Sequence, residues 1–306
     1  MNTNVGLRDK ENFDLNGKAQ QAENQGRTFG RDITNTLQQP LVDIQDEADA
    51  QRLGYYAKEI FEYLHSIETR HLPSCDYLNF QSDINSKMRA ILVDWIIDVH
   101  YKFKLIPETL YLTVNLIDRY LSAVEVQKRQ LQLVGVGALM IATKYEEIYP
   151  PEVKDFVHIT DNAYTSEDVL FIEREMLRVL EYNVTITSPY RFLERYNRLQ
   201  RSSEDGFYLS QYMIELGLLD YRMLKYKPSL LAASAIFLSN KFLKNSEAWP
   251  SVLRENSTYR DIDLKTCAKD LCVLLQNANN KNLQSLKKKF SSKSFNQVAT
   301  LNFKAK

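Results

Sequence analysis

Residues 88–95 read Met88-Arg89-Ala90-Ile91-Leu92-Val93-Asp94-Trp95, residues 108–112 read Glu108-Thr109-Leu110-Tyr111-Leu112, and residues 144–151 read Lys144-Tyr145-Glu146-Glu147-Ile148-Tyr149-Pro150-Pro151. In and around these stretches the apolar residues recur at helical spacing, with polar residues at a few places inside the pattern. None of the stretches resembles a catalytic centre. The pattern is typical of a helical protein whose surface binds another protein.

The composition is that of an ordinary globular protein. The chain has 306 residues, of which 44% are hydrophobic and 25% charged, and its 39 basic side chains balance its 39 acidic ones. A net charge of zero argues against attraction of the whole protein to nucleic acid or to an anionic membrane. The longest nearly apolar run, residues 133–142, is shorter than the roughly 20 residues that a membrane-spanning helix needs. We therefore expect neither nucleic acid nor membrane as a partner.

The cysteines and histidines predict no metal site. Cys75, Cys267 and Cys272 form an odd set without a CxxC pair, which argues against a disulfide framework and against zinc. The four histidines do not pair with them at ligand spacing. We expect no metal and no cofactor, and reduced thiols suit the cytosol or the nucleus. The polar N-terminus shows no secretory signal.

Helical periodicity runs through most of the chain. Residues 55–73, 87–104, 107–121 and 131–146 each form a candidate helix, and the last is apolar nearly all round. Thr165 to Asp168 resembles a capping box before a further helix. Strand-like alternation is not convincing anywhere, so the pattern predicts an all-α protein. Residues 1–45, rich in Asn, Gln, Asp and Gly, are too polar to offset the entropy of ordering and are predicted to be disordered.

The helical pattern repeats. When residue 110 is placed on residue 207 without gaps, residues 110–113 (LYLT) fall on 207–210 (FYLS) and residues 133–138 (LVGVGA) fall on 230–235 (LLAASA). The same register places Trp95 on Phe192. This agreement over several helices predicts two copies of one helical domain, each with a buried central helix of small residues.

Four motifs in order carry a family resemblance: MRAILVDW at 88–95, ETLYLTVNLIDRYLS at 108–122, LQLVG at 131–135 and KYEEIYPPE at 144–152. They resemble the mitotic cyclins, the B-type most of all, over roughly residues 50–290. The resemblance implies two tandem five-helix cyclin boxes preceded by an N-terminal helix and a disordered tail. We expect a disordered regulatory tail over 1–48, the N-terminal helix with the first box over 49–184, the second box over 185–292, and a C-terminal tail over 293–306.

The resemblance implies a regulatory subunit and not an enzyme. Such a protein binds and activates a cyclin-dependent protein kinase, controls entry into mitosis, and is found in nucleus and cytoplasm. The positions that would bind the kinase are Ile60, Tyr63, Lys144, Tyr145, Glu173, Leu177, Tyr182 and Val184. Lys144 and Glu173 would pair with each other beside the kinase's αC helix. From periodicity alone, the two charges would be separate solvated groups and the apolar positions ordinary core.

A second set of positions would dock substrates. In the family, a shallow groove receives substrate or inhibitor segments that contain Arg-x-Leu. Its counterparts here are Met88, Ile91, Leu92, Trp95, Asp98, Leu131 and Gln132. Asp98 would meet the arginine, the apolar residues would meet the leucine, and a mostly buried Trp95 would support the floor. Without the resemblance, a helical stripe with this spacing would be interpreted as part of the hydrophobic core.

Short motifs in the N-terminal segment resemble degradation signals. Lys10-Glu11-Asn12 is a KEN sequence, and Arg27 and Asn35 have the separation of a destruction box in which Gly30 stands where leucine is expected. The resemblance implies recognition by ubiquitin-ligase adaptors. The alternative for Lys10-Glu11-Asn12 is that a three-residue sequence of this kind occurs by chance.

Two other classes of protein compete with the kinase regulator. A transcription-initiation factor with paired cyclin-like repeats would bind DNA, but such proteins usually carry a zinc ribbon and a basic surface. An enzyme would need a recognisable centre, and the sequence contains no HExxH, P-loop or nucleophile elbow. The basic run Lys287-Lys288-Lys289 is interpreted as a solvated helix end rather than as a nuclear import signal.

Overall fold

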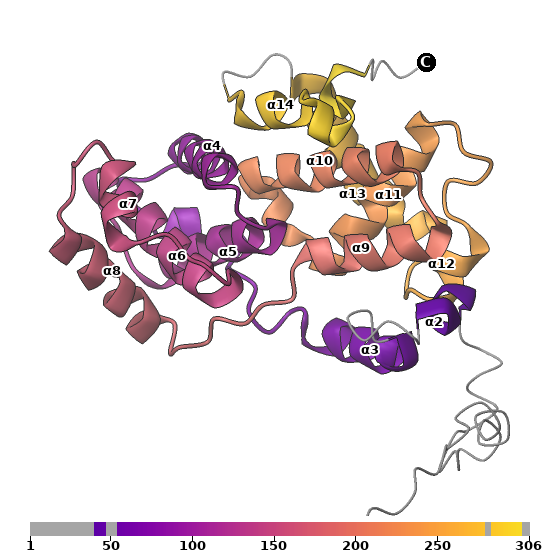
Figure 1. The fold of residues 1–306 in the computed structure, drawn as a ribbon, viewed down its shortest axis with the longest axis horizontal. Coiled ribbons are helices and arrows are strands. Elements are labelled where there is room, and N and C mark those ends of the chain that lie inside the picture. Colours follow the sequence, from indigo (N-terminus) through magenta and orange to yellow (C-terminus); the bar gives the residue numbers. More distant parts are fainter. Residues whose placement is uncertain (1–39, 47–53, 279–282, 302–306) are drawn as a thin grey trace, which may run out of the picture. The chain divides into compact units, whose positions relative to one another are not determined.

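The computed structural model describes residues 40–46, 54–278 and 283–301. Every regular element in these residues is a helix, which confirms the all-α prediction (Figure 1). The first repeat consists of α4 (Ser86–Phe103), α5 (Pro107–Ala123), α6 (Leu131–Glu146), α7 (Val153–His158) and α8 (Ser166–Val179). The second repeat consists of α9 (Pro189–Gln200), α10 (Glu204–Leu219), α11 (Pro228–Phe242), α12 (Ser251–Glu255) and α13 (Asp261–Asn277).

Further helices precede and follow the repeats. They are α2 (Leu41–Asp46) and α3 (Ala57–Ile67) before them and α14 (Ser285–Phe290) after them. Short 3-10 helices occupy connections and ends: η1 (Gly54–Tyr56), η2 (Tyr77–Asn79), η3 (Lys128–Gln130), η4 (Tyr221–Lys225), η6 (Lys293–Phe295) and η7 (Val298–Thr300). The predicted arrangement of two five-helix boxes is therefore present, and the register that places residue 110 on residue 207 superposes α5 on α10 and α6 on α11.

Local signals account for where several helices begin. The Asn85 side chain accepts hydrogen bonds from the backbone N–H groups of Lys87 and Met88 at 3.1 and 3.0 Å, which caps α4. Pro107 is the first residue of α5. The predicted capping box between Thr165 and Asp168 is confirmed at the start of α8.

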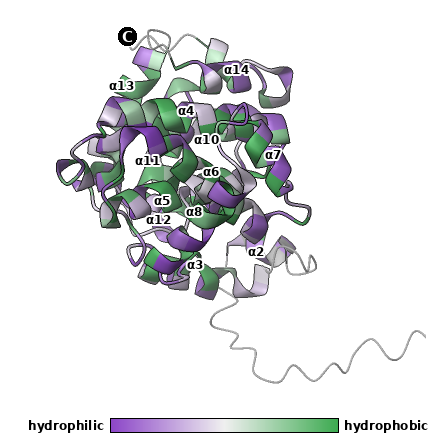
Figure 2. Cartoon of the chain, turned by 90° about the vertical axis from the view of Figure 1, so that its left-hand side faces the viewer, coloured by the Kyte–Doolittle hydropathy of each residue, from purple (hydrophilic) through white to green (hydrophobic). Residues whose placement is uncertain are grey.

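The central helix of each repeat is buried over most of its length. In α6 the residues from Val134 to Thr143 are all buried, and α11 is similar. A Cβ atom on Gly135 would lie 2.8 Å from Leu92 Cδ1, and one on Gly137 would lie 2.8 Å from Ile172 Cγ2. The two glycines therefore allow α4 and α8 to approach α6 closely. Figure 2 shows the hydrophobic colour concentrated on helices in the middle of the molecule, among them α5 and α11.

A buried ion pair lies where the two repeats meet. Arg89 on α4 donates to Asp118 on α5 through Nε and Nη2, both at 2.6 Å, and its Nη1 donates to the carbonyl of Leu218 on α10 at 2.8 Å. Tyr77 donates to the same carboxylate at 2.7 Å. Burial opposes the charge on Arg89, but Asp118 outweighs burial and raises the pKa of the guanidinium. The first repeat is thus joined to the second through a fully enclosed charge.

The segment before the repeats is tied to the second repeat. Glu68, just after α3, accepts hydrogen bonds from the backbone N–H and the hydroxyl of Ser229 on α11, both at 3.0 Å. Asp43 on α2 is buried and accepts two hydrogen bonds from Arg195 on α9. The prediction of disorder up to residue 48 is therefore wrong for residues 40–46, because a partner 152 residues away stabilises them.

The segment after the repeats is also packed rather than free. α14 lies against α4 and α10, and Leu286, Phe290, Val298 and Ala299 are buried (Figure 1). Residues 293–301, predicted as part of a C-terminal tail, thus belong to the folded body. The interpretation of the basic run as a solvated helix end is wrong for Lys289, which is buried and donates to Glu215 on α10 at 2.7 and 2.8 Å. Burial, together with Lys289, lowers the pKa of nearby His100 to about 3, so this imidazole is neutral.

Replacing Arg89 with alanine tests the ion pair at the junction. The change leaves the carboxylate of Asp118 in the interior without its cationic partner, so we expect the free energy of unfolding to fall by about 3–5 kcal/mol. Urea unfolding followed by circular dichroism measures this loss. Arg178→Ala is the control, because it removes an arginine from the exposed pair with Glu175 and should leave the stability nearly unchanged. Equal stabilities of the two variants would contradict a structural role for the buried pair.

Candidate functional site

Lys144 and Glu173 form the ion pair that the sequence analysis expects. Lys144 lies in the last turn of α6, and its Nζ is 2.6 Å from Glu173 Oε1 on α8. The lysine side chain is 46% exposed and the glutamate 12%. The pair therefore joins the C-terminal end of the buried helix α6 to α8, while the side chain of Lys144 remains accessible to solvent.

Tyr145 follows directly and lies at the edge of a cleft. Its hydroxyl is hydrogen-bonded to Thr185 Oγ1 at 2.5 Å, in the connection between the repeats, while half of the side chain is exposed. The cleft has a volume of about 1060 Å³ and is lined by α3, the end of α6, residues 185–188 and α9. Ile60 on α3 lines the same cleft as Tyr145. Thr185 was not predicted as a site residue.

The remaining predicted kinase-binding residues lie around α8 and on α3. Tyr182 follows α8 in a left-handed turn, with φ of 58°, and its side chain is 72% exposed. Tyr63 on α3 is exposed as well, whereas Leu177 and Val184 are partly buried against the core. The alternative that these positions belong to the hydrophobic core therefore holds in part for Leu177 and Val184, but not for Tyr63 and Tyr182.

A loop after α6 presents two apolar side chains that the sequence analysis did not select. Ile148 and Tyr149 are 87% and 91% exposed. The loop is anchored because Glu147 Oε1 accepts hydrogen bonds from the backbone N–H of Ile106 at 2.9 Å and from Thr109 Oγ1 at 2.6 Å. Large apolar side chains held so far into solvent are typical of a binding surface. The motif KYEEIYPPE could have indicated a loop here, because Pro150 and Pro151 prevent the helix from continuing.

The cleft has an acidic cluster at its edge. Arg191 Nη1 lies 3.5 Å from Glu108 and 3.2 Å from Glu194, and Glu146 also lines the cleft. Burial, reinforced by Glu108, raises the pKa of Glu146. Burial also raises the pKa of Glu194, although Arg191 opposes the shift. Two carboxylates thus share the guanidinium of Arg191, and the third, that of Glu146, lines the same cleft as Tyr145.

The predicted docking residues lie along α4 and at the start of α6. Ile91 is 53% exposed, Met88, Trp95 and Gln132 are partly buried, and Leu92 and Leu131 are buried. Leu92 contacts the backbone of α6 at Gly135. Leu92 and Leu131 can thus support this face from below, whereas Ile91 is exposed and Trp95 is partly exposed.

Asp98 occupies the end of this face. Its side chain is 26% exposed, and its carboxylate lies 2.7 Å from Lys102 Nζ and 3.8 Å from Lys288 Nζ on α14. The predicted acid is therefore shared between two lysines. The degron residues Lys10, Glu11, Asn12, Arg27 and Asn35 lie outside the described residues.

The described residues contain neither a metal-binding cluster nor a membrane-spanning helix. No group of three or more His, Cys, Asp and Glu side chains in the part of the chain that the structure describes could hold a metal ion. Among the described helices none is both long and apolar enough to span a bilayer.

Comparisons with known proteins show which family the chain belongs to. Residues 59–185 match the family model "Cyclin, N-terminal domain", and residues 187–304 match "Cyclin, C-terminal domain". The chain is 38% identical over 261 residues to "G2/mitotic-specific cyclin-B" of Dictyostelium discoideum, covering 85% of this chain and 60% of that protein. It is 40% identical over 266 residues to "Cyclin-B2-1" of Arabidopsis thaliana, covering 86% of this chain and 62% of that protein.

A solved structure shows the same fold. It is the X-ray structure of a viral cyclin from herpesvirus saimiri, with a TM-score of 0.62 and 18% identity, covering 70% of this chain and 97% of that one. The chain spans about 60% of the length of the two curated relatives above. The two matching domain models cover both helical repeats, and the relatives carry B-type names. The chain therefore belongs to the cyclin family and resembles its B-type mitotic members.

Proposed function

We propose that this chain is the regulatory subunit of a cyclin-dependent serine/threonine protein kinase and acts at entry into mitosis. One observation carries the proposal: a face of the first repeat exposes Lys144 and Tyr145 at the end of the buried helix α6, and Tyr182 in the turn that follows α8. Membership of the cyclin family and the B-type names of the relatives support the same role. The chain itself supplies no catalytic group in this proposal.

Activation is a shift between two states of the kinase. A protein kinase is inactive while the αC glutamate is turned away from the β3 lysine. A partner that binds only the active position of αC stabilises that position by the difference between its two affinities. In this proposal Lys144 lies beside αC and contacts polar groups of the kinase. Tyr145 and Tyr182 bury apolar surface against the kinase.

The proposed kinase-binding face is ordered before binding. Tyr145 is held by Thr185, Lys144 by Glu173, and the loop carrying Ile148 by the hydrogen bonds of Glu147. Side chains that are already fixed lose less entropy on association. A face whose side chains are already fixed favours tight binding to one conformation of the kinase. It is less suited to binding several conformations.

The face along α4 is the proposed substrate-docking groove. Met88, Ile91, Trp95 and Asp98 would bind segments that contain Arg-x-Leu, with the leucine against Ile91 and the arginine against Asp98. The exposure of Ile91, beside a partly buried Trp95, supports this assignment, because a core position would be covered.

The segment before the folded body is proposed to control the lifetime of the protein. Ubiquitin-ligase adaptors would bind Lys10-Glu11-Asn12 and the box from Arg27 to Asn35. The regulatory segment is thus residues 1–48 with the exception of the packed helix α2. We propose residence in nucleus and cytoplasm, where mitotic kinases act.

A DNA-binding initiation factor with the same fold is not favoured. The relatives are named mitotic cyclins, the net charge is zero, and the sequence has no CxxC pair. A DNA gel shift at increasing salt separates the two functions, since a true DNA-binding protein would show strong salt dependence.

Replacing Lys144 with glutamate tests the kinase-binding face. We expect the Kd for the activated cyclin-dependent kinase to rise at least tenfold, because the change reverses a charge at the centre of the interface. Size-exclusion chromatography and a histone phosphorylation assay with purified kinases measure binding and activation. Arg254→Glu is the matched control: its side chain is also 46% exposed and paired, but it lies on α12. Wild-type chain that neither binds nor activates any such kinase would contradict the proposal.

Replacing Ile91 with alanine tests the docking groove. Losing this apolar contact should cost about 1 kcal/mol, which is roughly fivefold in the Kd for an Arg-x-Leu peptide. Fluorescence anisotropy measures the affinity, and kinase activation should not change. Ile262→Ala on α13 removes an isoleucine of similar exposure, 60% against 53%, and should have no effect. Trp95→Ala should weaken docking and also lower stability. Unchanged peptide affinity in Ile91→Ala would reject the assignment.

Replacing residues 10–12 and Arg27 with alanine tests the degradation motifs. The variant should persist through mitotic exit with a half-life at least severalfold longer than that of the wild type, because the adaptors lose their recognition sequence. A cycloheximide chase in synchronised cells measures the half-life. The changed positions lie outside the described residues, and the pair between Asp43 and Arg195 is left intact. Identical decay of variant and wild type would disprove the assignment.

A further inference from the structure

Asp98 is held by two lysines that come from different elements. Lys102 is one turn further along α4, with Nζ 2.7 Å from Asp98 Oδ2. Lys288 comes from α14, with Nζ 3.8 Å from Asp98 Oδ1. Both lysine side chains are mostly exposed, at 65% and 71%, so another ligand can reach them. The second lysine reaches Asp98 only because the C-terminal segment folds onto the first repeat.

The position of Lys288 is fixed by its neighbours on α14. Ser285 donates to Asp94 on α4 from its backbone N–H at 3.2 Å and from its hydroxyl at 2.9 Å. Lys289 is bound to Glu215 on α10. α14 therefore lies along the side of α4 that carries Asp94 and Asp98, while Leu92 faces α6. The docking groove lies between these two sides, and Asp98 forms its boundary next to α14.

The charges at this boundary are balanced before a ligand binds. Asp98 pairs with both Lys102 and Lys288, and Asp94, one turn before it on α4, accepts from Ser285, so the four formal charges sum to zero. A docking arginine must share or take the carboxylate of Asp98 and adds one positive charge beside two ammonium groups. Like charges at such distances repel each other, although solvent screens the effect. A carboxylate in the same peptide would restore the balance and accept a hydrogen bond from the displaced lysine.

We propose that Lys288 is a specificity-determining residue, and that the groove selects Arg-x-Leu segments with an aspartate or glutamate next to the arginine. In the bound state the peptide arginine pairs with Asp98, and the peptide carboxylate pairs with Lys288 and Lys102. This inference rests on the proposed docking function of α4. It adds the C-terminal segment, through Lys288, to the residues that choose the substrate.

Two peptides test the selection. They are identical Arg-x-Leu segments except for glutamate or glutamine next to the arginine, and each is titrated with the full chain in a fluorescence anisotropy assay. We expect the wild type to bind the glutamate peptide about threefold more tightly, the size of one exposed ion pair, and added salt to reduce the preference. Lys288→Gln should remove most of the preference and should also tighten binding of the glutamine peptide, because Asp98 then has one competitor fewer.

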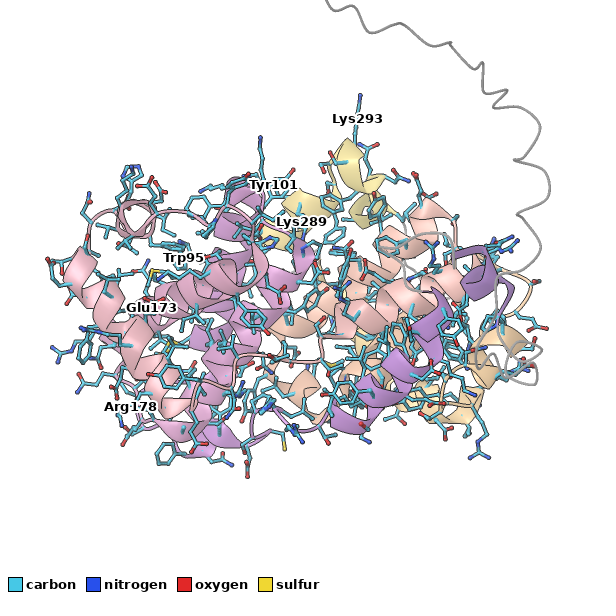
Figure 3. All side chains as sticks on the ribbon, turned by 60° about the horizontal axis from the view of Figure 1, so that its bottom comes forward. Trp95, Tyr101, Glu173, Arg178, Lys289 and Lys293 are labelled. Carbon is cyan, nitrogen blue, oxygen red and sulfur yellow. The ribbon has the colours of Figure 1, made fainter. Side chains whose placement is uncertain are left out.

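Lys293→Gln is the matched control. It removes one positive charge from the same C-terminal segment, but Lys293 lies on η6 and its side chain points away from the ribbon (Figure 3). It should keep the full preference for the glutamate peptide. Equal binding of both peptides by the wild type, a preference for the glutamine peptide, or an unchanged preference in Lys288→Gln would overturn the inference and leave the docking function standing. Failure of both peptides to bind would overturn the docking function as well.

Discussion

The guanidinium of Arg89 and the carboxylate of Asp118 are enclosed between the two helical repeats, and the arrangement of the repeats depends on this pair. Arg89 has donors left for the carbonyl of Leu218, so one side chain satisfies groups on α4, α5 and α10. Burying a charge is costly unless its partners are placed well. The pair therefore disfavours arrangements in which the repeats slide past each other, because any such shift would leave a charge unpaired in the interior.

Both ends of the folded body repeat this principle. Asp43 meets Arg195 and Glu68 meets Ser229 at the N-terminal end, while Lys289 meets Glu215 at the C-terminal end. Each contact joins a segment outside the repeats to a helix of the second repeat. The segments before and after the repeats thus both bind to the second repeat. The first repeat contacts the second through Arg89 and contacts α14 through α4.

The proposed binding surfaces use the opposite sides of these fixed elements. α4 buries Arg89 and Leu92 and exposes Ile91 and Asp98. α6 is buried along its length and exposes Lys144 and Tyr145 only at its end. A partner that binds either helix therefore meets side chains whose backbone cannot adapt. That rigidity is what a regulator needs if it is to stabilise one conformation of a kinase.

The sequence by itself determined the helices and their repetition, and its motifs carried the family resemblance that implied the pairing of Lys144 with Glu173. Periodicity, caps such as Asn85 and Thr165, and prolines act over a few residues, so they can be recognised without the fold. The tertiary structure alone decided that residues 40–46 and 293–301 are packed, that Lys289 is buried, and that Asp98 is shared with Lys288. Each of these depends on a partner far away in the chain, and a charged side chain looks the same in the sequence whether it faces water or a buried counterion.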